Sequence, residues 1–197
     1  VLIAILGFEL FGQIKLMSMY ADLFAREGYV SAQVLATKED FRDSQHYDNM
    51  KSCMENLLRD NVIPIVNEND VVAVAELLFT DNDELAGLIA SQIHADALLI
   101  LTSVDGVIAG NVGDPSATVI AEVDFSDEGS IENIEKHITP EKSEFGRGGM
   151  QTKFAIAKKL SREGITTHIV NGKKEGALVA AFGGKAIGTK FLPQKKL

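Results

Sequence analysis

Short runs of consecutive apolar residues alternate along this chain with longer segments of helical periodicity. The clearest run, ALLIL at 97–101, is too continuously apolar for a strand with one face in water. The other predicted strands cover 29–35, 62–66 and 167–170, and the predicted helices cover 8–24, 46–59, 83–94, 151–163 and 175–182. Alternating strands and helices predict an α/β fold with a mainly parallel open sheet and helices on both faces.

Turn signals complete this outline. Gly28 and Gly164 follow two of the helical segments and predict their C-terminal ends. Between 107 and 125, Gly, Asn and Asp-Pro signals separate short β-prone runs and predict a hairpin excursion. The sequence GTKF at 188–191 predicts a closing edge strand. At its start the chain enters a helix almost at once, so we expect no strand before that helix.

Composition narrows the class of protein. The 197 residues can bury a good core, and 46% hydrophobic with 24% charged residues is ordinary for a globular protein. No apolar run reaches the ~20 residues of a membrane span. A net charge of -9 argues against nonspecific binding to nucleic acid or to anionic lipid. The single cysteine, Cys53, fits a reducing cytoplasm, and its helical spacing with Met50, Met54 and Leu57 predicts that it packs in the core.

Two polar clusters stand where open α/β sheets bind ligands. The sequence NEND at 67–70 follows the predicted strand 62–66, and DND at 81–83 opens the predicted helix 83–94. Together they offer acceptors for an ammonium group, fixed dipoles for a carboxylate and anchors for water around a metal ion. A small zwitterionic substrate needs that mixture. Two polar loops with helix caps would explain the same residues, and both interpretations stay open at this point.

A glycine-rich stretch, GRGGMQTK at 146–153, leads into another predicted helix. Consecutive glycines let backbone N–H groups approach an anion, and a helix N-terminus adds partial positive charge. Lys153 lies early in that helix, where a cation is mildly unfavourable to the dipole, so its position suggests an anionic partner. The order of residues is neither a P-loop nor GxGxxG. Arg147 is equally well interpreted as a phosphate contact or as a solvated side chain.

The exit of the 97–101 strand is a third candidate. The sequence TSVDG at 102–106 supplies hydroxyls, a carboxylate and a turn, and Asp105 is either a site residue or part of an Asp-Gly turn. The histidines are scattered, and no pair has metal-ligand spacing.

In order and spacing, these motifs resemble the glutamate 5-kinases of the amino acid kinase family. The resemblance runs from Gly12 to Phe191 and includes Asp40 with Tyr47 and Asn49. The NEND and DND pair is specific to these enzymes among their relatives, whereas GGM at 148–150 is shared more widely. The resemblance implies an amino acid kinase-like three-layer sandwich over 1–197 as a single domain. It also implies that the family's first strand, with its lysine and glycine-serine turn, and the C-terminal RNA-binding-like domain of some members are missing.

The resemblance further implies transfer of the ATP γ-phosphoryl group, with Mg²⁺, to the side-chain carboxylate of glutamate. This reaction is the first step of proline biosynthesis, and the family suggests a cytoplasmic homo-oligomer with proline as a feedback inhibitor. Implied substrate-binding residues are Asp70, Asn82, Asn67 and Asn69. Implied nucleotide-binding residues are Thr102, Ser103, Arg147, Gly148, Gly149, Met150, Gln151, Thr152 and Lys153. Lys153 is the implied catalytic residue, because it meets the transferring phosphoryl group, and no protein ligand to the metal is implied.

Three positions depart from the family pattern. Ser103 stands where the family usually has Asp, Arg147 replaces a common Thr, and 108–114 lacks the usual Tyr-Thr after Asp-Gly. Two alternatives therefore stay open. One is a kinase of the same fold with another small carboxylate or phosphate acceptor. The other is a non-catalytic regulator that binds ATP or an amino acid without turnover.

Overall fold

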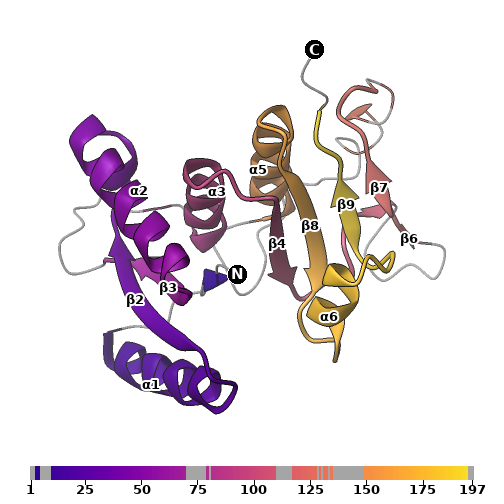
Figure 1. The fold of residues 1–197 in the computed structure, drawn as a ribbon. Helices are drawn as coiled ribbons and strands as arrows, with labels where there is room; N and C mark the ends of the chain where they lie inside the picture. The colour runs from indigo at the N-terminus through magenta and orange to yellow at the C-terminus, as the bar shows by residue number, and fades with distance from the viewer. Residues whose placement is uncertain are drawn as a thin grey trace. The chain divides into compact units, whose positions relative to one another are not determined.

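The computed structural model describes residues 3–4, 10–69, 79, 81–109, 117–127, 129, 131–132, 134 and 149–194. Contacts group the chain into a first unit, Val1–Ile93, and a second unit, His94–Leu197 (Figure 1). Each unit has its own sheet and its own buried residues.

The first unit contains a parallel three-stranded sheet of order β1-β3-β2. Its strands are β1 (Ile3–Ala4), β2 (Val30–Ala36) and β3 (Val62–Glu68). Ile3 lies opposite Ile65 in the ladder, so the expectation of no strand before the first helix is wrong. Strand β1 has only two residues, which is too short to show a hydrophobic period in the sequence. Strand β3 also runs past the expected end at Val66 and takes in Asn67 and Glu68.

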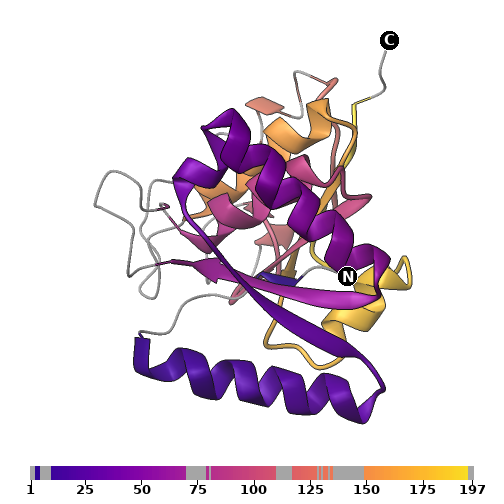
Figure 2. The same ribbon diagram turned by 60° about the vertical axis from the view of Figure 1, so that its left-hand side comes forward.

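Helices cover both faces of this sheet. They are α1 (Leu10–Arg26), the short 3-10 helix η1 (Lys38–Phe41), α2 (Ser44–Arg59) and α3 (Asn82–Gln92). Figure 2 shows β2 and β3 between α1 on one side and α2 on the other. Asp43 caps α2, because its carboxylate accepts hydrogen bonds from the N–H groups of Gln45 and His46, each at 3.0 Å.

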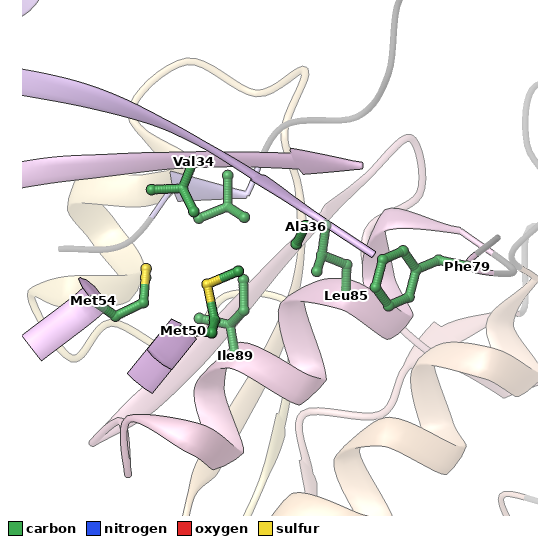
Figure 3. Packing of buried hydrophobic residues seen from close by; sticks show 8 residues of the cluster. Val34, Ala36, Met50, Met54, Phe79, Leu85 and Ile89 are labelled. Carbon is green, nitrogen blue, oxygen red and sulfur yellow. The ribbon is translucent and has the colours of Figure 1, made fainter. Parts of the chain in front are cut away.

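The core of the first unit lies between the sheet and helices α2 and α3. Figure 3 shows the residues that meet there, which are Val34 and Ala36 from β2, Met50 and Met54 from α2, Leu85 and Ile89 from α3, and Phe79. Cys53 does not join them, because it is exposed. The expectation that it packs in the core is wrong: the buried face of α2 is narrow, and Met50 and Met54 are its buried residues.

The second unit contains a mixed four-stranded sheet of order β4-β8-β9-β7. Its strands are β4 (Ala97–Thr102), β8 (Thr166–Asn171), β9 (Thr189–Phe191) and β7 (Glu122–Val123). The β4–β8 and β9–β7 pairs are parallel, and β8–β9 is antiparallel. The expectation of an edge strand at 188–191 is wrong, because β7 returns after the hairpin and pairs with the outer side of β9.

The hairpin excursion is confirmed. Strand β5 (Ile108–Ala109) pairs antiparallel with β6 (Thr118–Val119). The expectation that β4 is buried on both faces is wrong. Leu98 and Ile100 on one face are buried, whereas Ala97 and Leu101 on the other face are exposed.

Helices α5 (Met150–Arg162) and α6 (Ala177–Phe182) pack on β8. Phe154 of α5 packs against Phe125 and Phe191, with ring centroids 5.4 and 6.1 Å away. This contact holds α5 on the sheet face that Phe191 occupies. Gly28 and Gly164 follow α1 and α5 with φ of 78° and 86°, as predicted for helix ends. Among the described helices, none combines the length and apolar character that crossing a membrane requires.

Candidate functional site

Two side-chain amides meet at the carboxyl end of β3. Asn82 Nδ2, at the start of α3, donates a hydrogen bond of 3.2 Å to Asn67 Oδ1, near the end of β3. Asn67 is only 7% exposed, so its amide is fixed in a low-dielectric environment. This hydrogen bond joins the NEND and DND motifs across fifteen residues of the chain.

The neighbouring carboxylates hold the N-terminus of α3 in place. Asp81 caps the helix, since its Oδ1 accepts a hydrogen bond of 2.9 Å from the N–H of Glu84. Glu84 in turn forms an ion pair of 3.2 Å with Lys38 of η1. Asp83 is 7% exposed and lies in the first turn of α3, where the helix dipole stabilises a carboxylate. Asp83 is a candidate functional residue that the predicted set lacked, although its place in DND was a signal.

Glu68 of the NEND motif has a structural contact. Its Oε1 accepts a hydrogen bond of 2.7 Å from the backbone N–H of Phe79, eleven residues further along the chain. Phe79 is buried and packs edge-on against Phe41, with ring centroids 5.9 Å apart. Asn69 also contributes a backbone contact, because its N–H donates to Ala36 O at 2.8 Å. These contacts fix Asn69 and Phe79, whereas Asp70 lies outside the described residues.

A pocket of about 330 Å³ lies in the second unit, where β4 and β8 end. It is lined by Ser103, Val104, Asp105, Ile108, Ala117, Val119 and Asn171. Thr102 is the last residue of β4, and its carbonyl accepts a hydrogen bond of 2.9 Å from the N–H of Gly172. The carboxyl ends of two parallel strands thus meet at the pocket, which is the expected position of a ligand in an open α/β sheet.

Asp105 is a member of this site as well as a turn residue. Asn171 Nδ2 donates to its Oδ1 and Lys174 Nζ donates to its Oδ2, each at 2.8 Å. The hydrogen bond from Lys174, followed by that from Asn171, holds the pKa of the Asp105 carboxyl below its usual value. Asp105 therefore stays ionised and orders the two side chains beside the pocket.

Helix α5 begins at the same edge of the sheet. Helix α5 has 13 residues and β8 has 6, and both span about 20 Å. They pack together and are joined by only 163–165, so they run antiparallel. The start of α5 consequently lies level with the end of β8, where Asn171 lines the pocket.

The start of α5 has the features of an anion site. Gly149 is the N-cap with extended backbone, and Met150 is the first helical residue. Gln151 is exposed, Thr152 is half-buried, and Lys153 is only 8% exposed. The partial positive charge of a helix N-terminus favours a bound anion at this position. Arg147 and Gly148 lie outside the described residues.

Asn171 and Lys174 were not among the predicted site residues. The sequence NG at 171–172 predicted only a turn, although a polar residue directly after a buried strand is the signal that singled out Asn67. Lys174 carries no local signal, because its partner Asp105 is 69 residues away.

A search of protein-family models gives a match over most of the chain. The model of the amino acid kinase family matches residues 10–171. The chain belongs to the amino acid kinase family. The matched range includes every predicted site residue from both units.

Two curated relatives with similar sequences share one name. The glutamate 5-kinase of Chlorobaculum tepidum is 55% identical over 186 residues, which are 93% of this chain and 49% of that protein. The glutamate 5-kinase of Bacteroides thetaiotaomicron is 49% identical over 172 residues, which are 87% of this chain and 46% of that protein. The chain therefore spans about half the length of the curated relatives it matches.

Solved structures with the same fold include a UMP kinase and a carbamate kinase. UMP kinase from Bacillus anthracis has a TM-score of 0.62 at 15% identity, with 93% of this chain and 66% of that chain covered. The Giardia carbamate kinase has a TM-score of 0.61 at 16% identity, with 94% and 71% covered. These similarities confirm the α/β fold class with mostly parallel strands.

Proposed function

We propose that this protein transfers the γ-phosphoryl group of ATP to the side-chain carboxylate of glutamate, as the first step of proline biosynthesis. The observation that carries the proposal is the part-buried Asn82–Asn67 hydrogen bond, which joins the NEND and DND motifs in a chain 55% identical to a curated glutamate 5-kinase. The products are γ-glutamyl phosphate and ADP. We treat residues 1–197 as one kinase domain, with a glutamate site in the first unit and an ATP site in the second.

Asn82, Asn67 and Asn69 would hold the polar groups of glutamate, with Asp70 as the ionised acceptor for its ammonium group. Asn82 and Asn67 support this role because their amides are already oriented by a hydrogen bond to each other. The glutamate side-chain carboxylate is ionised at pH 7, so it needs no general base to act as a nucleophile. The work of the site is then to bring two anions together.

The second unit would bind ATP. The pocket beside Thr102 and Ser103 would take the nucleoside end, and the start of α5 would take the phosphates, with Arg147 and Gly148 preceding it. Lys153 would stabilise charge on the transferring phosphoryl group, because a buried cation acts more strongly than one in water. Two anionic substrates in a chain of net charge -9 require such local positive groups.

We expect the metal ion of this reaction to enter together with the nucleotide. Within the described ranges, no three His, Cys, Asp or Glu side chains gather as a protein-built metal site would need. Mg²⁺ commonly binds through substrate phosphates, one or two carboxylates and water. When bound, Mg²⁺ would neutralise charge on the phosphates.

An acceptor screen tests this proposal. The full-length protein is incubated with ATP and Mg²⁺, and ADP release is measured with glutamate, aspartate, UMP and carbamate in turn. We expect release with glutamate and background release with the other acceptors. Release with a different acceptor would contradict the assigned substrate. ATP binding without release for any acceptor would favour a regulator.

A further inference from the structure

Thr189 joins the middle of the second sheet to the loop behind the pocket. It lies in β9 and is fully buried, with 0% of its surface exposed. Its Oγ1 accepts a hydrogen bond of 2.8 Å from the backbone N–H of Val107, which is 82 residues away in the chain. A buried N–H group without such an acceptor would lose free energy, so this bond fixes where Val107 lies.

The loop that Thr189 holds is the wall of the pocket. Ser103, Val104, Asp105 and Ile108 all line the pocket, and they flank Val107 in sequence. The Val107 side chain is 1% exposed, so it points into the protein and not into the pocket. Its carbonyl accepts a hydrogen bond of 2.8 Å from the N–H of Ile120. Hydrogen bonds thus fix both backbone polar groups of Val107, the N–H through Thr189 and the carbonyl through Ile120.

Gly106 brings the loop into direct contact with Thr189. Its φ is +139°, and a Cβ atom built there would lie 2.7 Å from Thr189 Oγ1 and 3.0 Å from Thr189 N. The loop backbone therefore rests on β9 at the closest possible distance. Any side chain at 106 would push the loop away from Thr189 and move the pocket wall.

We infer that Thr189 is a positioning residue for the nucleotide site. It does not line the pocket, and it acts through the Val107 N–H to hold residues 103–108 in the conformation that binds ATP. ATP as the ligand rests on the proposed function, and the placement of Thr189 rests on the contacts above.

The test compares two substitutions that make the same chemical change. Thr189→Val replaces the hydroxyl with a methyl group and removes the acceptor for Val107. Thr167→Val does the same at another fully buried threonine of this sheet, whose Oγ1 has no hydrogen-bond partner among the described residues. The dissociation constant for ATP is measured by calorimetry on the full-length protein, well below the unfolding temperature of each variant.

We expect Thr189→Val to weaken ATP binding by roughly tenfold, because a buried hydrogen bond is lost from the pocket wall. Thr167→Val should leave ATP affinity unchanged, and Thr189→Ser, which keeps the acceptor, should restore it. In turnover, Thr189→Val should raise KM for ATP and leave KM for glutamate unchanged. Equal ATP affinity in Thr189→Val and wild type would overturn the inference, as would an equal loss in both valine variants.

Amide hydrogen exchange of the wild-type protein is a second test that does not depend on a variant folding. If Thr189 holds the loop, the Val107 amide exchanges slowly even without ATP. Fast exchange of this amide in the unliganded protein would contradict the inference. Because calorimetry measures ATP binding alone, a protein that binds ATP but does not phosphorylate glutamate would refute the proposed function and still test the role of Thr189.

Discussion

A hydrogen bond between the side-chain amides of Asn82 and Asn67 links the two motifs of the proposed glutamate site. We predict that Asn82→Ala raises KM for glutamate by roughly tenfold or more, because it removes a substrate contact and the donor to Asn67 Oδ1. KM for ATP should change little. Steady-state kinetics measure both values. Asn56→Ala is the control, since Asn56 is an exposed amide on α2 that bonds Arg59. An unaltered KM for glutamate would refute the assignment of Asn82.

Lys153 carries the proposed catalytic charge. We predict that Lys153→Ala lowers kcat by about 10²-fold or more, since the transition state loses a buried cation. Glutamate affinity should stay close to that of the wild type. The control is Lys159→Ala, which removes an exposed lysine from the same helix. The value of kcat is measured for both variants at saturating concentrations of both substrates. Equal kcat in the two variants would exclude the catalytic role of Lys153.

His168 makes stability depend on pH. Partial burial, and then the charge of Lys190 on the adjacent strand, lower the pKa of His168 from 6.5. The unfolded chain therefore takes up a proton at a higher pH than the folded protein does. The free energy of unfolding should fall as pH drops below 6.5 towards the folded pKa.

We predict that His168→Gln flattens this dependence, as measured by urea unfolding above and below pH 6.5. His94→Asn is the control, because His94 is exposed and its φ of 50° suits asparagine. If the free energy of unfolding still depends on pH in His168→Gln and no longer does so in His94→Asn, the assignment to His168 is wrong.

At the scale of the element, β9 depends on the glycine that precedes it. A Cβ atom at Gly188 would overlap the carbonyl oxygen of Ile169 in β8, and φ there is +67°. We predict that Gly188→Ala destabilises the protein by roughly 3 kcal/mol or more, as expected for backbone strain combined with overpacking.

Gly184→Ala separates the two causes. Its φ of +73° imposes the same strain, but the built Cβ has no heavy atom within 4 Å. Its cost should be about 1–2 kcal/mol by chemical denaturation. Equal costs for Gly184→Ala and Gly188→Ala would show that the contact with Ile169 does not matter.

Elements with a clear period were predictable from the sequence, whereas their partners were not. Helices α1, α2, α3 and α5 and strands β2, β3, β4 and β8 lie within a few residues of their predicted positions. The interior place of β9 was not predictable, because its pairing with β7 joins residues far apart in the chain. Asn171 and Lys174 could not be predicted as site residues for the same reason. Their hydrogen bonds to Asp105 span 66 and 69 residues of the chain, respectively.

At the scale of the whole molecule, the two proposed substrates are assigned to different units. Asn67 and Asn82 belong to the first unit, and Ser103, Asp105 and Lys153 belong to the second. Substitutions that weaken binding in one unit should therefore raise KM for the substrate assigned to that unit and leave KM for the other substrate unchanged. Proline inhibition, assembly into a homo-oligomer and a cytoplasmic location remain expectations from the family.

We propose above that the protein forms an acyl phosphate on glutamate. Trapping that product with hydroxylamine, in the presence of the full-length protein, ATP, Mg²⁺ and glutamate, tests it most directly. We predict γ-glutamyl hydroxamate in amounts equal to the ADP released, and none when aspartate replaces glutamate. ADP release without hydroxamate, or no product from folded protein that binds ATP, would contradict the account.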